Sequence, residues 1–142
     1  MRKVVLLGAS GSIGKQTIEI INEHLDEIVI EAVSVGNNIE YLSELLKTYP
    51  IKRAYSITKD EKLAAEFKDT EFFAGEDGLC EMLEGLKYDL LINALVGFVG
   101  LRPTLKAIED GIDVALANKE TLVASGDIVM KKAKENDVKI IP

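Results

Sequence analysis

Short apolar runs alternate with longer amphipathic segments along the whole chain, and this alternation restricts the possible folds more than any other feature of the sequence. The runs are rich in Val, Ile and Leu and are bounded by Gly, Asp, Asn or Lys. Strands that are apolar on both faces suit a parallel sheet covered by helices. The predicted strands are Val4–Leu7, Ile28–Val35, Ala54–Ile57, Leu90–Ala94, Val114–Ala117 and Val138–Ile141, with Phe72–Phe73 as a further short one.

The segments between these runs carry apolar residues at the spacing of one helix face. Strict alternation of strand and helix predicts an α/β fold, a Rossmann-like doubly wound parallel sheet with right-handed crossovers. No repeat or linker interrupts the pattern, so we expect a single domain. The expected helix faces are Ile13, Thr17, Ile20 and Ile21; Leu42, Leu45, Leu46 and Tyr49; Leu79, Met82, Leu83 and Leu86; Leu105, Ala107 and Ile108; and Val123, Ile128, Val129 and Ala133.

The segment from Gly8 to Gly14, Gly-Ala-Ser-Gly-Ser-Ile-Gly, joins the first predicted strand to the first helix. Its G-x-x-G-x-x-G spacing is a variant of the dinucleotide fingerprint, in which glycines allow a tight turn and a close backbone approach to a pyrophosphate. Free N–H groups at the start of a helix hold phosphates, and Ser10 and Ser12 can add hydroxyl donors. The segment therefore predicts a dinucleotide-binding turn, with a plain structural turn as the alternative.

A nucleotide-triphosphate loop is a competing interpretation because Gly14-Lys15 resembles the end of that motif. The triphosphate loop requires a glycine five residues before Gly14, where this chain has Ala9. It also requires Ser or Thr after the lysine, where this chain has Gln16. Two mismatches in so short a motif exclude this interpretation.

The end of the second predicted strand, Gly36-Asn37-Asn38, carries no acid. NAD-binding domains usually place an acid here on the ribose 2′-hydroxyl, and an acid would repel the 2′-phosphate of NADP. The sequence thus favours NADPH, although no Arg or Lys stands in this segment to bind that phosphate. A simple turn is the alternative, because Gly and Asn are favoured in turns.

Two later segments fall at the same predicted edge of the sheet. Residues 95–100 place two glycines in an apolar loop, which indicates close approach to a flat ligand or simply the start of a helix. Asn118, Lys119 and Glu120 follow the next strand and come directly before a helix. Ligands bind outside the carboxyl ends of parallel strands, which favours a functional role, although a glutamate at a helix start is favourable without one.

Composition narrows the classes of partner. The 24 acidic and 17 basic residues give a net charge of −7, which argues against a nucleic-acid surface. Cys80 is the only cysteine, so no internal disulfide is expected, and His24 is the only histidine, which we interpret as a surface residue rather than a metal ligand. The apolar run before Gly8 is too short for a signal peptide, and no stretch is long enough to span a membrane. We expect a cytoplasmic protein without a membrane partner.

Four segments together, Gly8–Gly14, Gly36–Asn38, Ala94–Leu101 and Leu116–Val123, resemble the N-terminal domain of the 1-deoxy-D-xylulose 5-phosphate reductoisomerase family in order and spacing. Members of that family isomerise 1-deoxy-D-xylulose 5-phosphate and reduce the product with NADPH to 2-C-methyl-D-erythritol 4-phosphate, a step of non-mevalonate isoprenoid biosynthesis. They use Mg²⁺ or Mn²⁺ and form homodimers. The resemblance implies that residues 1–142 are the NADPH-binding domain, with the catalytic, metal-binding and C-terminal helical domains outside this chain.

The resemblance also implies roles for single residues. It implies that this chain holds no metal ligand and does not turn over substrate alone, because the family's metal-binding carboxylates follow the position of Pro142. A basic residue often stands in the family where this chain has Asn37, so the strictness of the NADPH preference is open. The implied contacts are Ser10, Gly11, Ser12 and Ile13 with the pyrophosphate; Gly36, Asn37 and Asn38 with the 2′-phosphoribose; Asn118 and Glu120 with the nicotinamide; and Lys119 with the substrate, Lys119 and Glu120 being the catalytic candidates.

Three alternatives remain open at this point. One is another NADPH-dependent reductase, such as a homoserine-dehydrogenase-like protein, which can also carry an Asn-Lys pair after a strand. A second is a non-catalytic nucleotide sensor. The third is a structural α/β domain whose glycine turn binds nothing.

Overall fold

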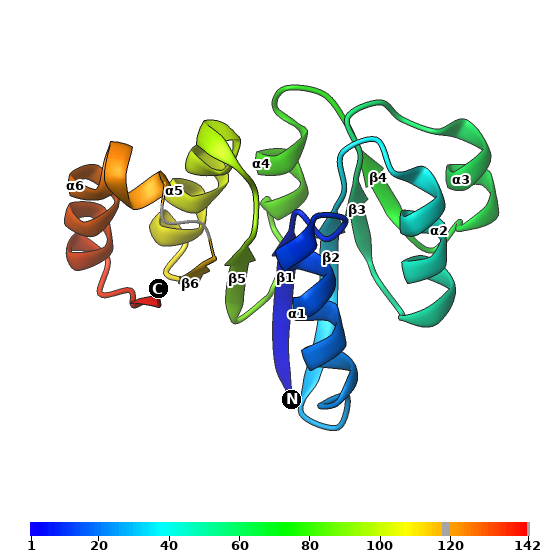
Figure 1. The fold of residues 1–142 in the computed structure, drawn as a ribbon, viewed down its shortest axis with the longest axis horizontal. Helices are drawn as coiled ribbons and strands as arrows, with labels where there is room; N and C mark the ends of the chain where they lie inside the picture. The colour runs from blue at the N-terminus through cyan, green and yellow to red at the C-terminus, as the bar shows by residue number, and fades with distance from the viewer. Residues whose placement is uncertain (118–119, 142) are drawn as a thin grey trace.

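Within residues 1–117 and 120–141, which the computed structural model describes, seven parallel strands form one sheet in the order β4-β3-β2-β1-β5-β6-β7 (Figure 1). Side chains are described for these residues except 120–125. Val4 of β1 lies opposite Ile30 of β2 on one side and Leu90 of β5 on the other. The strands are β1 (Arg2–Leu7), β2 (Ile28–Ser34), β3 (Arg53–Tyr55), β4 (Glu71–Phe73), β5 (Leu90–Asn93), β6 (Asp113–Leu116) and β7 (Ile140–Ile141).

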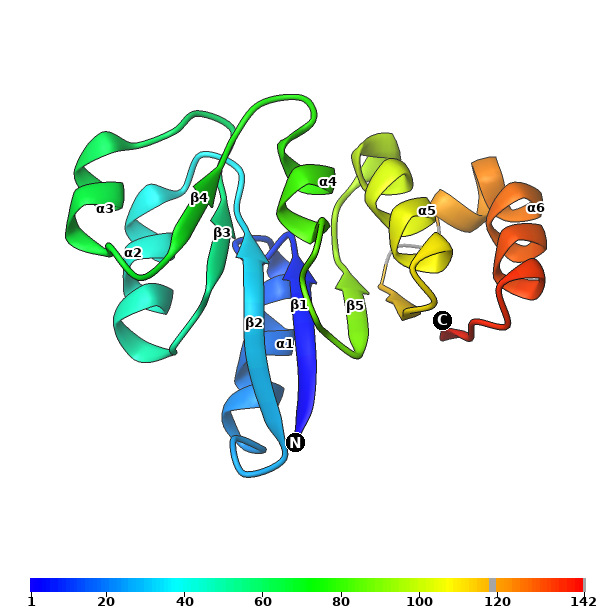
Figure 2. The ribbon, with the colours of Figure 1, turned by 180° about the vertical axis from the view of Figure 1, so that it is seen from behind.

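Helices cover both faces of this sheet. One face packs against α1 (Ser12–Asn22), α2 (Ile39–Thr48) and α3 (Glu61–Glu66). The other packs against α4 (Gly78–Leu83), α5 (Leu101–Glu109) and α6 (Glu120–Glu135), and a short 3-10 helix, η1 (Gly97–Gly100), precedes α5. Helix α1 lies in front of β1 and β2 in Figure 1 and behind them in Figure 2. The predicted doubly wound, Rossmann-like α/β fold is therefore confirmed.

Strand β1 shows why the chain needs helices on both faces. Val4 and Leu6 belong to the core beneath α1 and α2, whereas Val5 and Leu7 belong to the core beneath α4, α5 and α6. All four side chains are buried. Alternate residues of a strand point to opposite faces, so a continuous apolar run is stable only between two layers of helices.

The predicted apolar face of α1 is partly wrong. Ile13 and Ile20 are 45% and 59% exposed, whereas Gly14, Ile18 and Ile21 face the sheet. Both sets have helical spacing, so periodicity alone could not separate them. The close contact of Gly14 with the preceding turn sets the rotation of the helix and brings Ile18 and Ile21 inward.

Other expectations differ at single positions. Ile57 lies beyond the end of β3 and is exposed, and Ile128 points to solvent although Val129 and Ala133 of the same helix are buried. Helix α3 was not expected from the pattern, because its six residues contribute only Leu63 to the core. The expected face of α2 and the short strand around Phe72–Phe73 are confirmed, and the side chain of Val123 lies outside those described.

Strands β1 and β5 are neighbours in the sheet but far apart in sequence. The crossover from β1 runs over one face through α1, and the crossover from β5 runs over the other through α5. This reversal is the switch point of a doubly wound sheet, where ligands bind outside the carboxyl ends of the strands. The loops that leave β1 and β5 are thus the first place to look for a site.

Candidate functional site

The turn after β1 has a conformation that depends on two glycines. Gly8 has a φ of +81°, which residues with side chains rarely adopt, and a Cβ there would lie 2.9 Å from the backbone of Ala94 after β5. A Cβ on Gly14 would lie 2.0 Å from the carbonyl oxygen of Gly8. Helix α1 therefore begins in direct contact with the turn, and neither glycine can be replaced without a shift of backbone.

Ser34, the last residue of β2, fixes this turn in place. The Gly8 amide donates a hydrogen bond to the Ser34 hydroxyl at 2.8 Å, and the Ala9 amide donates to the Ser34 carbonyl oxygen, also at 2.8 Å. Ser34 is buried. The turn is thus held at the carboxyl edge of β2 before any ligand arrives.

The N-terminus of α1 offers free donors. Gly11 is the N-cap and provides no side-chain acceptor, and the first amide with a partner in this helix is that of Lys15, which donates to the Gly11 carbonyl. Among the described residues, the amides of Ser12, Ile13 and Gly14 find no acceptor. No acidic residue stands in the first turn. Three free N–H groups at the positive end of an uncapped helix form a binding position for an anion.

Gly11 leaves this position open. The atom nearest to a Cβ at Gly11 is the Gly8 carbonyl oxygen at 3.7 Å, an ordinary contact distance, so protein packing does not explain the glycine. Ser12 and Ile13 are exposed and Ser10 is half-buried. The structure therefore brings Ser10, Gly11, Ser12 and Ile13 together on one accessible turn.

The loop after β2 lies beside this turn, and its residues have structural partners. The Asn38 side-chain oxygen accepts a hydrogen bond from the Tyr41 amide at 3.1 Å and caps α2. The carbonyl oxygen of Gly36 accepts from Ile57 at 3.0 Å. An asparagine cap stabilises a helix by about 1 kcal/mol, so Asn38 needs no ligand to explain its presence. Asn37 is exposed and makes no side-chain hydrogen bond among the described residues.

Sequence reasoning missed one charged residue close to this loop. The ammonium group of Lys15 lies 5.1 Å from the centroid of the Tyr41 ring, so it stands between the first turns of α1 and α2. From the sequence, Lys15 was considered only as part of the triphosphate-loop motif, which was rejected. Its contact with a residue 26 positions further on depends on the packing of two helices, which a linear pattern does not show.

A buried polar network shapes the loop after β5. The Asn93 amide nitrogen donates to the Gly100 carbonyl oxygen at 3.0 Å and to the Thr104 hydroxyl at 2.8 Å, and its oxygen accepts from the Leu95 amide. Asn93 is 2% and Thr104 0% exposed. Because each buried polar group has a partner, the network holds the loop in one shape instead of destabilising the core.

This loop presents apolar side chains to solvent. Val96, Phe98 and Val99, which we term the apolar rim, are 77%, 67% and 64% exposed. Large exposed apolar groups beside a polar turn are typical of ligand or partner surfaces. The rim lies at the same sheet edge as the Gly8–Gly14 turn, since both follow the carboxyl ends of neighbouring strands.

The segment that contains the predicted site residues Asn118, Lys119 and Glu120 follows β6. The Ala117 amide donates to the Asn93 carbonyl oxygen at 3.0 Å, which ties the end of β6 to the end of β5. Asn118 and Lys119 lie outside the described residues. Glu120 is the first residue of α6, and its side chain also lies outside those described.

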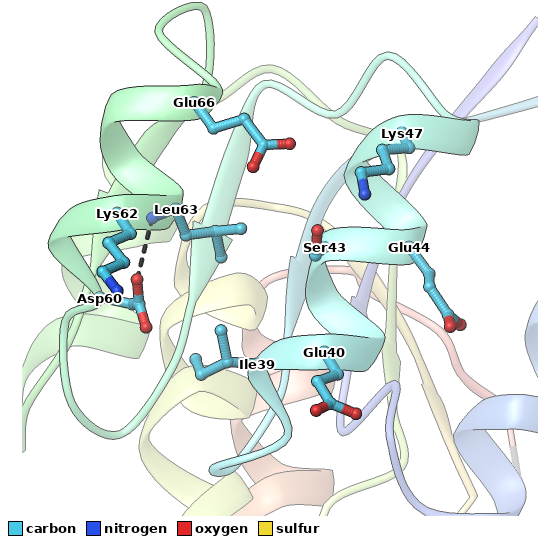
Figure 3. A pocket seen from close by; sticks show the side chains of 9 residues that line it. All are labelled: Ile39, Glu40, Ser43, Glu44, Lys47, Asp60, Lys62, Leu63 and Glu66. Carbon is cyan, nitrogen blue, oxygen red and sulfur yellow. Dashed lines mark hydrogen bonds between the residues drawn. The ribbon is translucent and has the colours of Figure 1, made fainter.

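A groove of about 470 Å³ separates α2 from α3, away from the glycine turn. Figure 3 shows Leu63 and Glu66 of α3 pointing toward α2, with Ile39 at one end of the groove. Four carboxylates and two lysines line it together with Ser43. The excess of negative charge disfavours the phosphates of a nucleotide, so this groove is a poorer anion site than the start of α1. Its lining is Ile39, Glu40, Ser43, Glu44, Lys47, Asp60, Lys62, Leu63 and Glu66.

A second hollow, of about 400 Å³, contains the only cysteine of the chain. Cys80 is half-buried in α4 and shares the hollow with Ile57 and Phe98. Burial raises the pKa of the Cys80 thiol, although Arg102 nearby opposes the shift. A thiol that stays protonated is a weak nucleophile, which supports a structural role.

His24 lies in the turn after α1, 3.5 Å from the carboxylate of Glu27, and both side chains are largely exposed, so its predicted surface position is confirmed. Among the side chains that the structure describes, those of residues 1–117 and 126–141, no three His, Cys, Asp or Glu residues converge as a metal-binding group. No helix in the described part of the chain is both long and apolar enough to cross a membrane.

Sequence alignments with curated relatives extend over the whole chain. A family model described as 1-deoxy-D-xylulose 5-phosphate reductoisomerase matches residues 4–126. The reductoisomerase of Listeria innocua is 46% identical over 144 residues, and that of Macrococcus caseolyticus is 39% identical over 142. Each match covers 100% of this chain and 38% of the relative, so the chain spans little more than a third of the length of these proteins.

Solved structures show the same fold. A crystal structure of DOX-P reductoisomerase in complex with NADPH, fosmidomycin and magnesium superimposes with a TM-score of 0.92 at 32% identity, covering 100% of this chain and 36% of that one. The Zymomonas mobilis reductoisomerase in complex with NADPH gives 0.86 at 35%, with 99% and 38% covered. A homoserine dehydrogenase from Thiobacillus denitrificans gives 0.65 at 18%, with 99% and 28% covered, a likeness of fold alone.

The sequence matches and the structural matches at 32% and 35% identity point to the same family. They extend over nearly all of the chain, and the glycine turn, the loop after β2 and the loop after β5 all lie within the matched residues. The chain belongs to the 1-deoxy-D-xylulose 5-phosphate reductoisomerase family.

Proposed function

We propose that residues 1–142 form the N-terminal NADPH-binding domain of an enzyme that isomerises and reduces 1-deoxy-D-xylulose 5-phosphate to 2-C-methyl-D-erythritol 4-phosphate, a step in isoprenoid precursor synthesis. The observation that carries this proposal is the uncapped start of α1 at the switch point of the sheet, in a chain of this family. Two related structures at 32% and 35% identity are complexes with NADPH, which supports the choice of cofactor.

The start of α1 is the proposed pyrophosphate position. The amides of Ser12 and Ile13 donate to phosphate oxygens, Gly11 allows the close approach, and the Ser10 and Ser12 hydroxyls add donors. Charge-assisted hydrogen bonds of this kind are about twice as strong as neutral ones. The fixed turn supplies these donors without a cost in loop ordering, because Ser34 already holds it.

The two ends of the cofactor are proposed to lie on either side of this turn. Gly36, Asn37 and Asn38 line the 2′-phosphoribose, at the carboxyl end of β2. On the β6 side, we propose that Asn118 and Glu120 border the nicotinamide, which supplies a hydride when the cofactor is bound. Lys119 contacts the substrate there, where an ammonium group stabilises negative charge on a substrate oxygen.

The described residues do not fit a divalent metal ion, although three related structures are complexes with magnesium. A hard cation needs several oxygen ligands around it, and no three acidic, His or Cys side chains converge in the described part of the chain. The proposal assigns nucleotide binding to this chain, and the family resemblance supports Mg²⁺ or Mn²⁺ ligands of the complete enzyme that lie outside it.

We also propose that the complete enzyme is a cytoplasmic homodimer. The cytoplasmic assignment is supported by a single, half-buried cysteine, which forms no internal disulfide. Dimerisation is supported by the family resemblance, and part of the exposed apolar rim is available for contacts beyond this chain.

Calorimetric titration of this chain tests the proposal. We expect NADPH and NADH both to bind, because both carry the pyrophosphate that α1 receives, with NADPH the tighter ligand. With 1-deoxy-D-xylulose 5-phosphate, NADPH and Mg²⁺ all present, we expect no oxidation of NADPH by the chain alone.

Two results would contradict this proposal. If neither NADPH nor NADH bound at millimolar concentration, the glycine turn would not be a nucleotide site in this chain. Turnover of the substrate by residues 1–142 would show that the catalytic and metal-binding groups are not outside it.

A further inference from the structure

Lys15 lies at the edge where the cofactor is expected, and no described residue forms an ion pair with it. Its side chain contacts the Tyr41 ring, with 5.1 Å from the ammonium nitrogen to the ring centroid. The side chain is exposed. No carboxylate among the described residues forms an ion pair with this ammonium group, so its charge is available to an anionic ligand.

The Tyr41 contact places the ammonium group beside the loop after β2. The Tyr41 amide is bonded to the Asn38 side chain, so the ring belongs to the first turn of α2, directly after Gly36–Asn38. Lys15 itself belongs to the first turn of α1, where its amide bonds to Gly11. The charge is therefore carried by the helix that follows the proposed pyrophosphate position, and it lies against the first turn of the helix that follows the proposed 2′-phosphoribose position.

The surroundings otherwise disfavour a phosphate at this loop. Gly36, Asn37 and Asn38 carry no charge, and Glu40 stands in the first turn of α2. Glu44 and Glu19 lie close enough to Tyr41 to help burial raise its pKa. A 2′-phosphate carries close to two negative charges and needs a positive group to offset these carboxylates.

We propose that Lys15 supplies the positive charge for the 2′-phosphate of NADPH and thereby sets the preference for NADPH over NADH. This inference rests on the proposed function and adds the residue that determines cofactor specificity. The Tyr41 ring holds the ammonium group at the mouth of the loop, from which the flexible lysine stem reaches the phosphate. Lys15 thus provides from α1 the charge that the loop itself lacks.

The test compares dissociation constants for NADPH and NADH in charge variants of this chain. For Lys15→Gln we expect NADPH affinity to fall about tenfold, as for loss of one charge-assisted hydrogen bond, and NADH affinity to change less than about twofold. Lys15→Arg should keep most of the NADPH preference. In the Lys15→Gln background, Asn37→Arg should restore it, because the charge then comes from the loop.

Lys47→Gln is the matched control. It removes the same charge from the last turn of α2, roughly 12 Å along the helix axis from Ile39, and should leave both affinities unchanged. An equal fall for NADPH and NADH in Lys15→Gln would assign Lys15 to the pyrophosphate or to structure and overturn the inference, as would no change in either. Failure of the unmodified chain to bind any dinucleotide would instead overturn the proposed function.

Discussion

Replacement of Gly14 by alanine is expected to destabilise this chain by roughly 2–4 kcal/mol and to abolish dinucleotide binding. The added Cβ would lie 2.0 Å from the Gly8 carbonyl oxygen and 2.7 Å from the Ala9 Cα, and both neighbours are backbone atoms that cannot rotate away. Alanine gains about 1 kcal/mol of helix propensity over glycine, but overpacking against backbone costs about 3 kcal/mol or more. Thermal unfolding should show a fall in Tm of about 10 °C.

Gly11→Ala is the control for this prediction. A Cβ at Gly11 would have an ordinary contact of 3.7 Å with the Gly8 carbonyl oxygen, so stability should stay within about 1 kcal/mol of the unmodified chain. The methyl group would nevertheless cover the approach to the Ser12 and Ile13 amides, and NADPH affinity should fall. If Gly14→Ala unfolded at the same temperature as Gly11→Ala, the close packing of α1 on the turn would be refuted.

The second large effect is expected from Asn93→Leu, with a loss of about 3–4 kcal/mol in the free energy of unfolding. The substitution removes the donor for the Gly100 carbonyl and the Thr104 hydroxyl, both in buried surroundings, and each unpaired polar group costs about 1–3 kcal/mol. The loop from Leu95 to Gly100 loses its anchor, so NADPH affinity should fall as well. Urea unfolding at constant m-value measures the first effect, and calorimetry the second.

Thr104→Val separates the parts of this network. Valine matches the size of threonine and removes one acceptor, while Asn93 keeps its bond to Gly100, so the expected loss is about 1–2 kcal/mol. If Asn93→Leu and Thr104→Val lowered the free energy of unfolding equally, the hydrogen bond to Gly100 would contribute nothing to stability. A loss below about 1 kcal/mol for Asn93→Leu would show that the network does not anchor the loop.

The parallel sheet was predictable because a strand that is buried on both faces is a continuous apolar run in the sequence. The run Val4–Leu7 has no polar residue, and only helices on both faces can cover it. The buried face of α1 was mispredicted, although the glycine motif contains the information needed to identify it. Once Gly14 is known to face the turn, helical spacing places Ile18 and Ile21 inward and leaves Ile20 outside.

The features that the sequence did not reveal depend on contacts between distant segments. Lys15 meets Tyr41 through the packing of α1 beside α2, and Asn93 meets Thr104 through the path of the loop between them. Neither pair has a periodic or composition signal. Asn38 is similar, because its capping role follows from the backbone geometry at the start of α2.

Helix α3 was not predicted, for a different reason. It has only six residues, of which Leu63 alone is buried, so it is too short to show a periodic face. The helix is instead recognisable by its cap, since the Asp60 side chain accepts a hydrogen bond from the Leu63 amide at 2.9 Å. Short helices of this kind depend on capping and packing more than on intrinsic propensity.

The central claim is that the start of α1 binds the phosphates of a dinucleotide, and an NMR titration of the labelled chain with NADPH tests it most directly. The account predicts the largest amide shifts at Ser12, Ile13 and Gly14, with smaller shifts at Asn37 and Asn38. Amide protons that gain a phosphate acceptor should move strongly, because they have no acceptor in the described structure. Shifts confined to the acidic groove around Ser43 and Leu63, with the first turn of α1 unchanged, would contradict the claim.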